Sequence, residues 1–170
     1  MRQFINFLDG INRVVGESVA WLALYMVLVQ FIVVVMRYVF GVGSIFLQES
    51  IIYMHAMLFM FGAGYTLLKD GHVRVDVFYR EATPRTQAIV DLFGAVCFLI
   101  PVTLTIFSIS WSYVTDSWSV LEGSKETSGI HAVYILKTVI PIFCVLVILQ
   151  GVSMIGKSLL VLRGFDLNKG

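Results

Sequence analysis

The chain has 170 residues, of which 58% are hydrophobic and 14% are charged, and its mean hydropathy is +0.88. Soluble domains carry about a quarter charged residues, so this composition excludes a water-soluble globule. The net charge of +1 arises from scattered Lys and Arg residues rather than from a basic stripe, which gives no indication of nucleic-acid binding.

Four stretches contain no Asp, Glu, Lys or Arg, and they cover residues 18–36, 50–68, 92–115 and 138–156. Each has at least 19 residues, and a helix of about 20 residues crosses a hydrocarbon core of ~30 Å. We therefore predict an all-α integral membrane bundle that forms a single domain over residues 1–170. Its four transmembrane helices are expected at about residues 17–37, 45–68, 86–113 and 132–156.

Residues 2–16 precede the first span and have a helical period of apolar and polar side chains. Phe4, Leu8 and Ile11 lie on the apolar side, and Asp9 and Asn12 lie on the polar side. Amphipathic helices of this kind lie in the membrane interface. We therefore predict an N-terminal interfacial helix that turns into the first span, and not a signal peptide, because no convincing small-x-small cleavage site follows.

The distribution of basic residues predicts the orientation of the bundle. Nine of the 12 Lys and Arg residues lie in the N-terminal segment, the second connection and the C-terminal tail, and three lie on the other side. Because Lys and Arg accumulate in cytoplasmic loops, we expect both termini and the second connection to be cytoplasmic.

The second connection contains alternating apolar and charged residues, namely Val73, Arg74, Val75, Asp76 and Val77. This alternation predicts an extended segment with one apolar face. Thr83 followed by Pro84 is typical of a helix cap and a first helical residue, so the third helix is expected to begin there.

Glu49 and Lys137 are charged residues placed inside predicted spans rather than clearly at their ends, both in the outer half and at similar depth. Such residues are costly in lipid unless they are paired or hydrated. Arg37 leaves the first span on the same side and is a possible third member. An ion or proton site is one interpretation, but we favour structural salt bridges or snorkelling side chains because neither residue lies near the bilayer midplane.

Pro101 and Pro141 lie inside spans, where each removes a hydrogen bond from a carbonyl oxygen one turn earlier. Such free carbonyls can bind cations. We expect instead a kinked helix in which a neighbouring hydroxyl, such as that of Thr105 or Thr138, satisfies the carbonyl.

Cofactor and catalytic patterns are weak. Haem ligation needs facing histidines at equal depth, but of His55, His72 and His131 only His55 lies within a span. Cys97 and Cys144 have neither metal nor redox spacing, and we expect both to be packing residues. Ser/His/Asp, Walker and zinc patterns are absent, so we predict neither enzymatic activity nor a cofactor.

The features together resemble the small membrane subunit of the tripartite ATP-independent periplasmic (TRAP) transporters. The resemblance rests on Arg37-Tyr38, Gln48-Glu49, Gly62-Ala63-Gly64-Tyr65, Gly71-His72-Val73-Arg74-Val75-Asp76, Glu122-Gly123-Ser124, Gly129, and Lys137 through Ile140-Pro141 to Leu149-Gln150. The His-Val-Arg-Val-Asp segment is the most specific part.

In that family a periplasmic binding protein delivers an organic acid to a large multi-span membrane subunit, and sodium gradients drive the transport. The resemblance implies a scaffold-like small subunit in the bacterial inner membrane, with the substrate and sodium sites in the large subunit. It assigns structural or subunit-interface roles to Arg37, Glu49, Lys137, Pro141, His72, Arg74, Asp76, Glu122, Ser124 and Gln150.

Two alternatives belong to other functional classes. A haem-bearing anchor of a respiratory complex requires His55 as a ligand. A self-associating four-helix exporter requires a functional acid at Glu49.

Overall fold

The computed structural model describes residues 2–72, 79 and 81–165, and every regular element in this part of the chain is a helix. Four helical segments are long and apolar enough to cross a membrane. They are α1 (Arg2–Tyr38), α2 (Ile45–Leu68), the segment Pro84–Ser119 and α6 (Val133–Leu162). The predicted all-α bundle with four spans is confirmed, and the chain is a multi-pass membrane protein.

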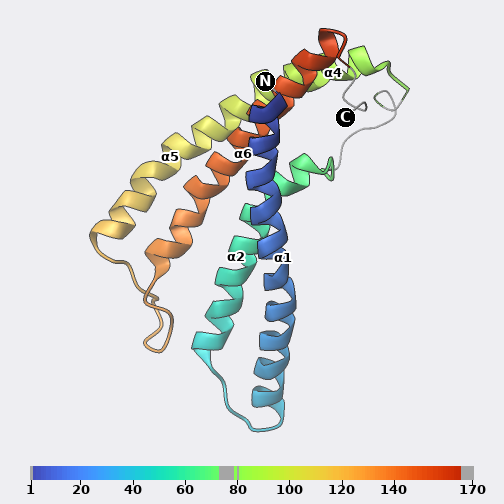
Figure 1. Cartoon of the computed structure of the whole chain (residues 1–170). Coiled ribbons are helices and arrows are strands. Elements are labelled where there is room, and N and C mark those ends of the chain that lie inside the picture. The colour runs from blue at the N-terminus through green and yellow to red at the C-terminus, as the bar shows by residue number, and fades with distance from the viewer. Residues whose placement is uncertain (1, 73–78, 80, 166–170) are drawn as a thin grey trace.

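The helices form two hairpins that diverge from each other (Figure 1). One hairpin consists of α1 and α2, and the other consists of α6 and the helix that precedes it. The N-terminal half of α1 crosses α6, and α6 contacts each of the other described helices. The start of α1 and the end of α6 lie at one end of the molecule, and the connections 39–44 and 120–132 lie towards the opposite end (Figure 1).

Helix α1 is continuous over 37 residues, a length of ~55 Å. The predicted turn between an interfacial helix and the first span is therefore wrong. The polar side of residues 2–16 provides the reason, because Asp9 and Asn12 are buried in the protein. The apolar residues Phe4 and Phe7 of the same segment are exposed. Asp9 and Asn12, together with the apolar Ile5 and Leu8, thus face the rest of the bundle rather than water.

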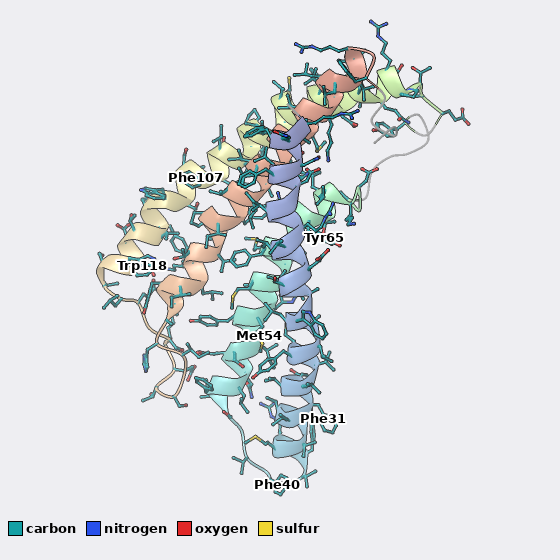
Figure 2. All side chains as sticks on the ribbon, viewed as in Figure 1. Phe31, Phe40, Met54, Tyr65, Phe107 and Trp118 are labelled. Carbon is teal, nitrogen blue, oxygen red and sulfur yellow. The ribbon has the colours of Figure 1, made fainter. Side chains whose placement is uncertain are left out.

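The seam between α1 and α2 is apolar. Val29 and Val33 of α1 are buried together with Met54 of α2, and Leu47 and Ile51 pack around them. Figure 2 shows Met54 at this seam and Phe31 further along α1. Phe31 is 66% exposed, as expected for a side chain that faces lipid.

The ends of two helices follow from local capping. The Ser44 hydroxyl accepts the Leu47 amide at 3.4 Å and begins α2. The Thr83 hydroxyl accepts the Thr86 amide at 3.3 Å. Helix α4 (Pro84–Gly94) begins at the proline, as predicted.

The third span contains a π-helical turn, η1 (Ala95–Leu99), between α4 and α5 (Ile100–Ser119). In this turn the amide of Ile100 donates to the carbonyl of Ala95, one residue further back than in an α-helix. The wider turn comes directly before Pro101, whose ring would clash with the previous turn of a regular helix.

The predicted hydroxyl contacts to the freed carbonyls are wrong. Thr105 donates instead to the carbonyl of Pro101 at 2.8 Å, and Thr138 donates to the carbonyl of Tyr134 at 2.7 Å. Both hydroxyls therefore bond to the carbonyl four residues before them, which is the ordinary choice for a threonine inside a helix.

Candidate functional site

A polar cluster fixes the connection 120–132 to the neighbouring helices, and we name Glu49, Ser117, Glu122, Ser124 and Lys137 the loop cluster. Glu49 of α2 accepts the backbone amide of Ile130 at 2.6 Å and also accepts the Ser124 hydroxyl. Two donors of the loop therefore bind the same carboxylate. They join a segment 75 residues or more away in sequence to the beginning of α2.

The other half of the loop cluster lies between the end of α5 and the beginning of α6. Leu121 has a left-handed backbone with a φ of 46°, and the amide of Glu122 donates to the carbonyl of Ser117 at 3.0 Å. This closure directs the Glu122 carboxylate at the Lys137 ammonium, with which it forms an ion pair, and at the Ser117 hydroxyl, which donates at 2.7 Å. The ammonium also lies 3.9 Å from the ring centroid of Tyr113.

Glu122 lies in the connection, outside the spans. The hydrogen bond from Lys137 is the main cause that lowers the pKa of the Glu122 carboxyl, and the Ser117 hydrogen bond lowers it further. Both contacts favour the charged form, so Glu122 is an anion at neutral pH.

The possible pairing of Glu49 with Lys137 is not observed. The structure brings both residues to the same loop, but Glu49 binds Ser124 and Ile130, whereas Lys137 binds Glu122. Each charge holds a different part of the loop.

A second polar cluster joins α1 to α6, and we name Asp9, Asn12, Gln150, Ser153 and Lys157 the α1–α6 cluster. The Asp9 carboxylate forms an ion pair with the Lys157 ammonium at 2.6 Å. It also accepts hydrogen bonds from the Ser153 hydroxyl and from Nε2 of Gln150, the latter at 3.2 Å. Three donors on successive turns of α6 thus converge on one carboxylate of α1.

Asn12 extends this cluster towards α2. It is fully buried, and its Nδ2 donates to Oε1 of Gln150 at 3.1 Å and to the carbonyl of Leu146 at 3.2 Å. A Cβ atom placed on Gly64 of α2 would lie 2.1 Å from Oδ1 of Asn12. Glycine is therefore required for α2 to approach the junction of α1 and α6 so closely.

Sequence reasoning identified Gln150 but missed Asp9, Asn12, Ser153 and Lys157 as its partners. A signal was present, because Gln150, Ser153 and Lys157 are spaced three and four residues apart on α6 and form one polar stripe on the C-terminal half of a largely apolar helix. The polar side of residues 2–16 was the complementary surface.

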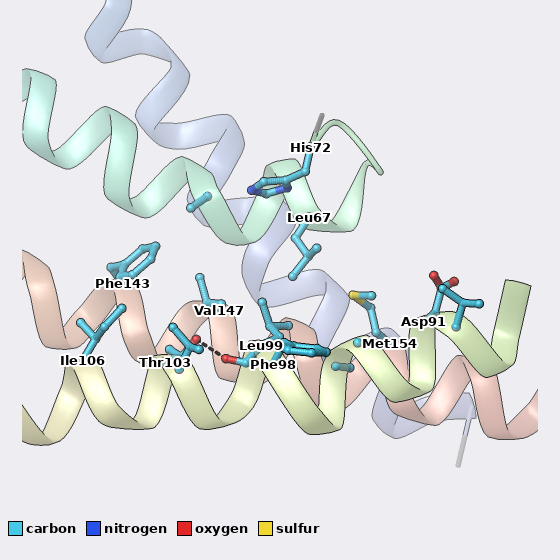
Figure 3. A pocket seen from close by; sticks show the side chains of 15 residues that line it. Leu67, His72, Asp91, Phe98, Leu99, Thr103, Ile106, Phe143, Val147 and Met154 are labelled. Atoms are coloured by element: carbon cyan, nitrogen blue, oxygen red, sulfur yellow. Dashed lines mark hydrogen bonds between the residues drawn. The ribbon is translucent and has the colours of Figure 1, made fainter. Parts of the chain in front are cut away.

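An apolar groove of about 620 Å³ lies between the end of α2 and the helices α4, α5 and α6. Figure 3 shows Asp91 towards one end of it, His72 on the side of α2, and Phe98, Leu99 and Phe143 along its walls. Among the described residues that line it, Thr103 alone carries a hydroxyl, which already donates to the carbonyl of Leu99 at 2.6 Å. The groove therefore offers little to a hydrophilic anion.

A protein-family model described as "Tripartite ATP-independent periplasmic transporters, DctQ component" matches residues 26–160. The chain belongs to this family. No curated protein and no solved structure matches the chain. The DctQ match confirms the resemblance, since it covers most of the bundle. The matched range includes Glu49 with its partner Ser124 and Glu122 with its partner Lys137.

The other candidate residues of this DctQ-family chain have different environments. Arg37 is exposed at the end of α1, Pro141 and Gln150 are buried in α6, and His72 is exposed at the groove. Arg74 and Asp76, together with the predicted extended segment at residues 73–77, lie outside the described residues.

The residues considered for cofactors are dispersed in this DctQ-family chain. Within residues 2–72, 79 and 81–165, no group of three His, Cys, Asp or Glu side chains is arranged to hold a metal ion. His55 is exposed and stacks on Phe59, with ring centroids 6.3 Å apart. Cys144 is buried as predicted, but Cys97 is exposed, so the prediction of a packing role is wrong for Cys97.

Proposed function

We propose that this DctQ-family chain is the scaffold-like small subunit of a sodium-driven secondary transporter that imports organic acids. In this proposal a periplasmic binding protein delivers the carboxylate to a large multi-span subunit, which holds the substrate and sodium sites. The small subunit has no catalytic activity and no cofactor of its own. The observation that carries the proposal is the family match over residues 26–160.

The contacts within the bundle support a scaffold role. Glu49, Glu122 and Lys137 hold a loop, and Asp9 and Lys157 hold two helices together. These ionisable groups therefore serve internal contacts rather than a transport path. A transporter that moves one domain through the bilayer needs another part to remain fixed. The helices of this chain, which are joined to one another by these contacts, would add to that fixed part.

We further propose a location in the bacterial inner membrane with both termini in the cytoplasm. The excess of Lys and Arg in the terminal segments and the second connection supports this orientation. The connection 120–132 then faces the periplasm, on the side from which the binding protein approaches.

Neither alternative function is favoured by an observation. An exporter would need Glu49 to be free to exchange protons or cations, but both of its carboxylate oxygens accept hydrogen bonds from the loop. A haem anchor would need a buried ligand, and His55 is exposed.

The test is purification of the tagged chain from its native membrane in a mild detergent, followed by uptake measurements in vesicles that contain the whole system. We expect a multi-span protein in roughly equal amount, and organic-acid uptake that requires a sodium gradient. A version lacking residues 2–15 should assemble and transport less without a change in solute preference. Recovery of the chain alone as a self-associated bundle would overturn the proposal.

A further inference from the structure

Four polar side chains lie on one side of the α1–α2 hairpin, and we name Gln30, Arg37, Gln48 and His55 the hairpin polar face. Gln30 and Arg37 are seven residues apart on α1, and Gln48 and His55 are seven apart on α2, so each pair repeats along one side of its helix. Three of the four also meet in space, because a groove of about 260 Å³ is lined by Gln30, Val33, Arg37, Gln48 and Ile51.

These side chains are accessible and lack polar partners. Gln30, Arg37 and His55 are exposed and Gln48 is half-buried. Within the described part of the chain, none of the four side chains forms a hydrogen bond or an ion pair. Threonines of the spans behave differently, since Thr103 and Thr105, for example, donate to carbonyls of their own helix. Within the described residues, the longer side chains of the hairpin polar face form no such hydrogen bond with their own helix.

Lipid alone does not provide hydrogen-bonding partners for all the side chains of the hairpin polar face. Gln30 lies within the uncharged stretch 18–36, and an unpaired amide in hydrocarbon costs several kcal/mol. Arg37 can reach lipid phosphates at the membrane boundary, but Gln30 lies about 10 Å deeper along α1. Acyl chains offer no hydrogen-bonding group at that depth.

The charge of the face specifies the chemistry of its partner. The guanidinium of Arg37 is permanently cationic, and no carboxylate is among the residues that line the groove. A partner that brings one carboxylate near the outer end of α1 would neutralise this cation. Val33 of the groove also packs with Val29 and Met54 in the buried contact between α1 and α2, so this contact holds the two helices of the face together.

We infer that a transmembrane helix of the large subunit packs on the hairpin polar face, with a carboxylate at Arg37 and hydrogen-bonding groups at Gln30 and Gln48. The inference rests on the proposed function and adds the location and chemistry of the subunit contact. The helix lies along the groove that Gln30, Arg37 and Gln48 line between α1 and α2.

Site-specific photo-crosslinking in native membranes that contain the whole transporter tests this contact. The photoreactive residue p-benzoylphenylalanine replaces Gln30 in one variant and Phe31 in the control. Phe31 is 66% exposed but points about 100° away around the same helix. We expect at least a tenfold higher yield of the adduct with the large subunit, identified by peptide mass spectrometry, from position 30.

Other results would overturn the inference. Equal yields from the two positions, adducts with lipid only, or adducts with a second copy of this chain would each exclude a specific large-subunit contact at this face. If the unmodified chain still co-purifies with the large subunit, such a result refutes the location and leaves the proposed function intact. If the large subunit is not recovered at all, the proposed function fails.

Charge reversal provides a second measurement. We expect Arg37→Glu to reduce the recovery of the large subunit at least fivefold, whereas Arg37→Lys retains most of it because the positive charge remains. The thermal stability of the isolated chain should be the same in both variants, since Arg37 has no partner within the described residues. Equal recovery with glutamate and lysine would contradict an acidic partner.

Discussion

The two polar clusters contain similar groups and differ in what they join. The α1–α6 cluster connects two helices, and its members Asn12, Gln150 and Ser153 are at most 1% exposed. The loop cluster connects helices to a loop, and its Glu122 side chain is 36% exposed. A carboxylate and an ammonium pair in both, and in each pair one side chain is about a third exposed while the other is at most 13% exposed. What differs is the surroundings, because only the Asp9–Lys157 pair adjoins buried amides.

This difference determines what each cluster contributes. Removing one member of a buried network leaves the remaining members without partners in a low-dielectric environment, which costs more than the contact itself contributes. The loop cluster instead holds a connection, and when that connection opens its charged groups can return to water and be screened. We therefore expect the α1–α6 cluster to set the stability of the bundle and the loop cluster to set the local order of the connection.

The largest expected effect is at the point where α2 meets the α1–α6 cluster. In Gly64→Ala the new methyl would lie 2.1 Å from Oδ1 of Asn12, so either the Asn12 side chain must leave its hydrogen bonds with Leu146 and Gln150 or the helices must separate. We expect the free energy of unfolding to fall by up to about 3 kcal/mol, measured by denaturant titration in detergent. Gly62→Ala is the matched control, because a methyl there meets nothing within 4 Å. Equal losses in both variants would show that the close approach at Gly64 is unimportant.

The ion pair of the α1–α6 cluster should have the next largest effect. Asp9→Asn leaves Lys157 without its charged partner, and we expect a loss of about 2 kcal/mol, below the range for fully buried pairs because the Lys157 side chain is 33% exposed. Lys157→Met should cost a similar amount, and the double variant should cost less than the sum of the two. The exposed Glu17→Gln on the same helix is the control. Strictly additive losses would contradict a direct interaction.

The sequence was sufficient to predict the four spans and the limits of α2. Charge-free stretches and the helix cap at Thr83 are local signals, and local signals are visible in one sequence. The importance of Glu49 and Lys137 was also predictable, because ionisable groups inside apolar stretches need partners.

The partners themselves were not predictable. Whether Lys137 binds Glu49 or Glu122 depends on the turn at Leu121, whose left-handed backbone is unusual for leucine. The continuity of α1 depends on whether Asp9 faces water or α6, and an amphipathic pattern is the same in both cases. Both questions are decided by tertiary packing rather than by periodicity.

In the loop cluster, Glu49→Gln should loosen the connection without unfolding the bundle. The amide side chain keeps one acceptor oxygen but loses the charge that strengthens the contacts with Ser124 and Ile130. We expect hydrogen exchange of the Ile130 amide to become about tenfold faster, which corresponds to ~1.4 kcal/mol of local opening. The midpoint of global unfolding should hardly change. Glu126→Gln, an exposed position in the same loop, should leave the exchange rate unaltered.

The smallest effect should be the pH dependence of the Glu122 contact. The hydrogen bonds from Lys137 and Ser117 lower the pKa of Glu122 below its ordinary value of 4.5, so the stabilisation is fully present above that pH. It is lost as the pH falls below 4.5 through the lowered pKa of the folded protein. Trp118, whose indole donates to Thr138 at 2.8 Å, provides a fluorescence reporter next to the pair once Trp21 and Trp111 are replaced by Phe. We expect an acid transition in this signal that Glu122→Gln removes, because glutamine does not titrate. A transition between pH 6 and 8, or one that persists in the variant, would show that another group controls the order of the loop.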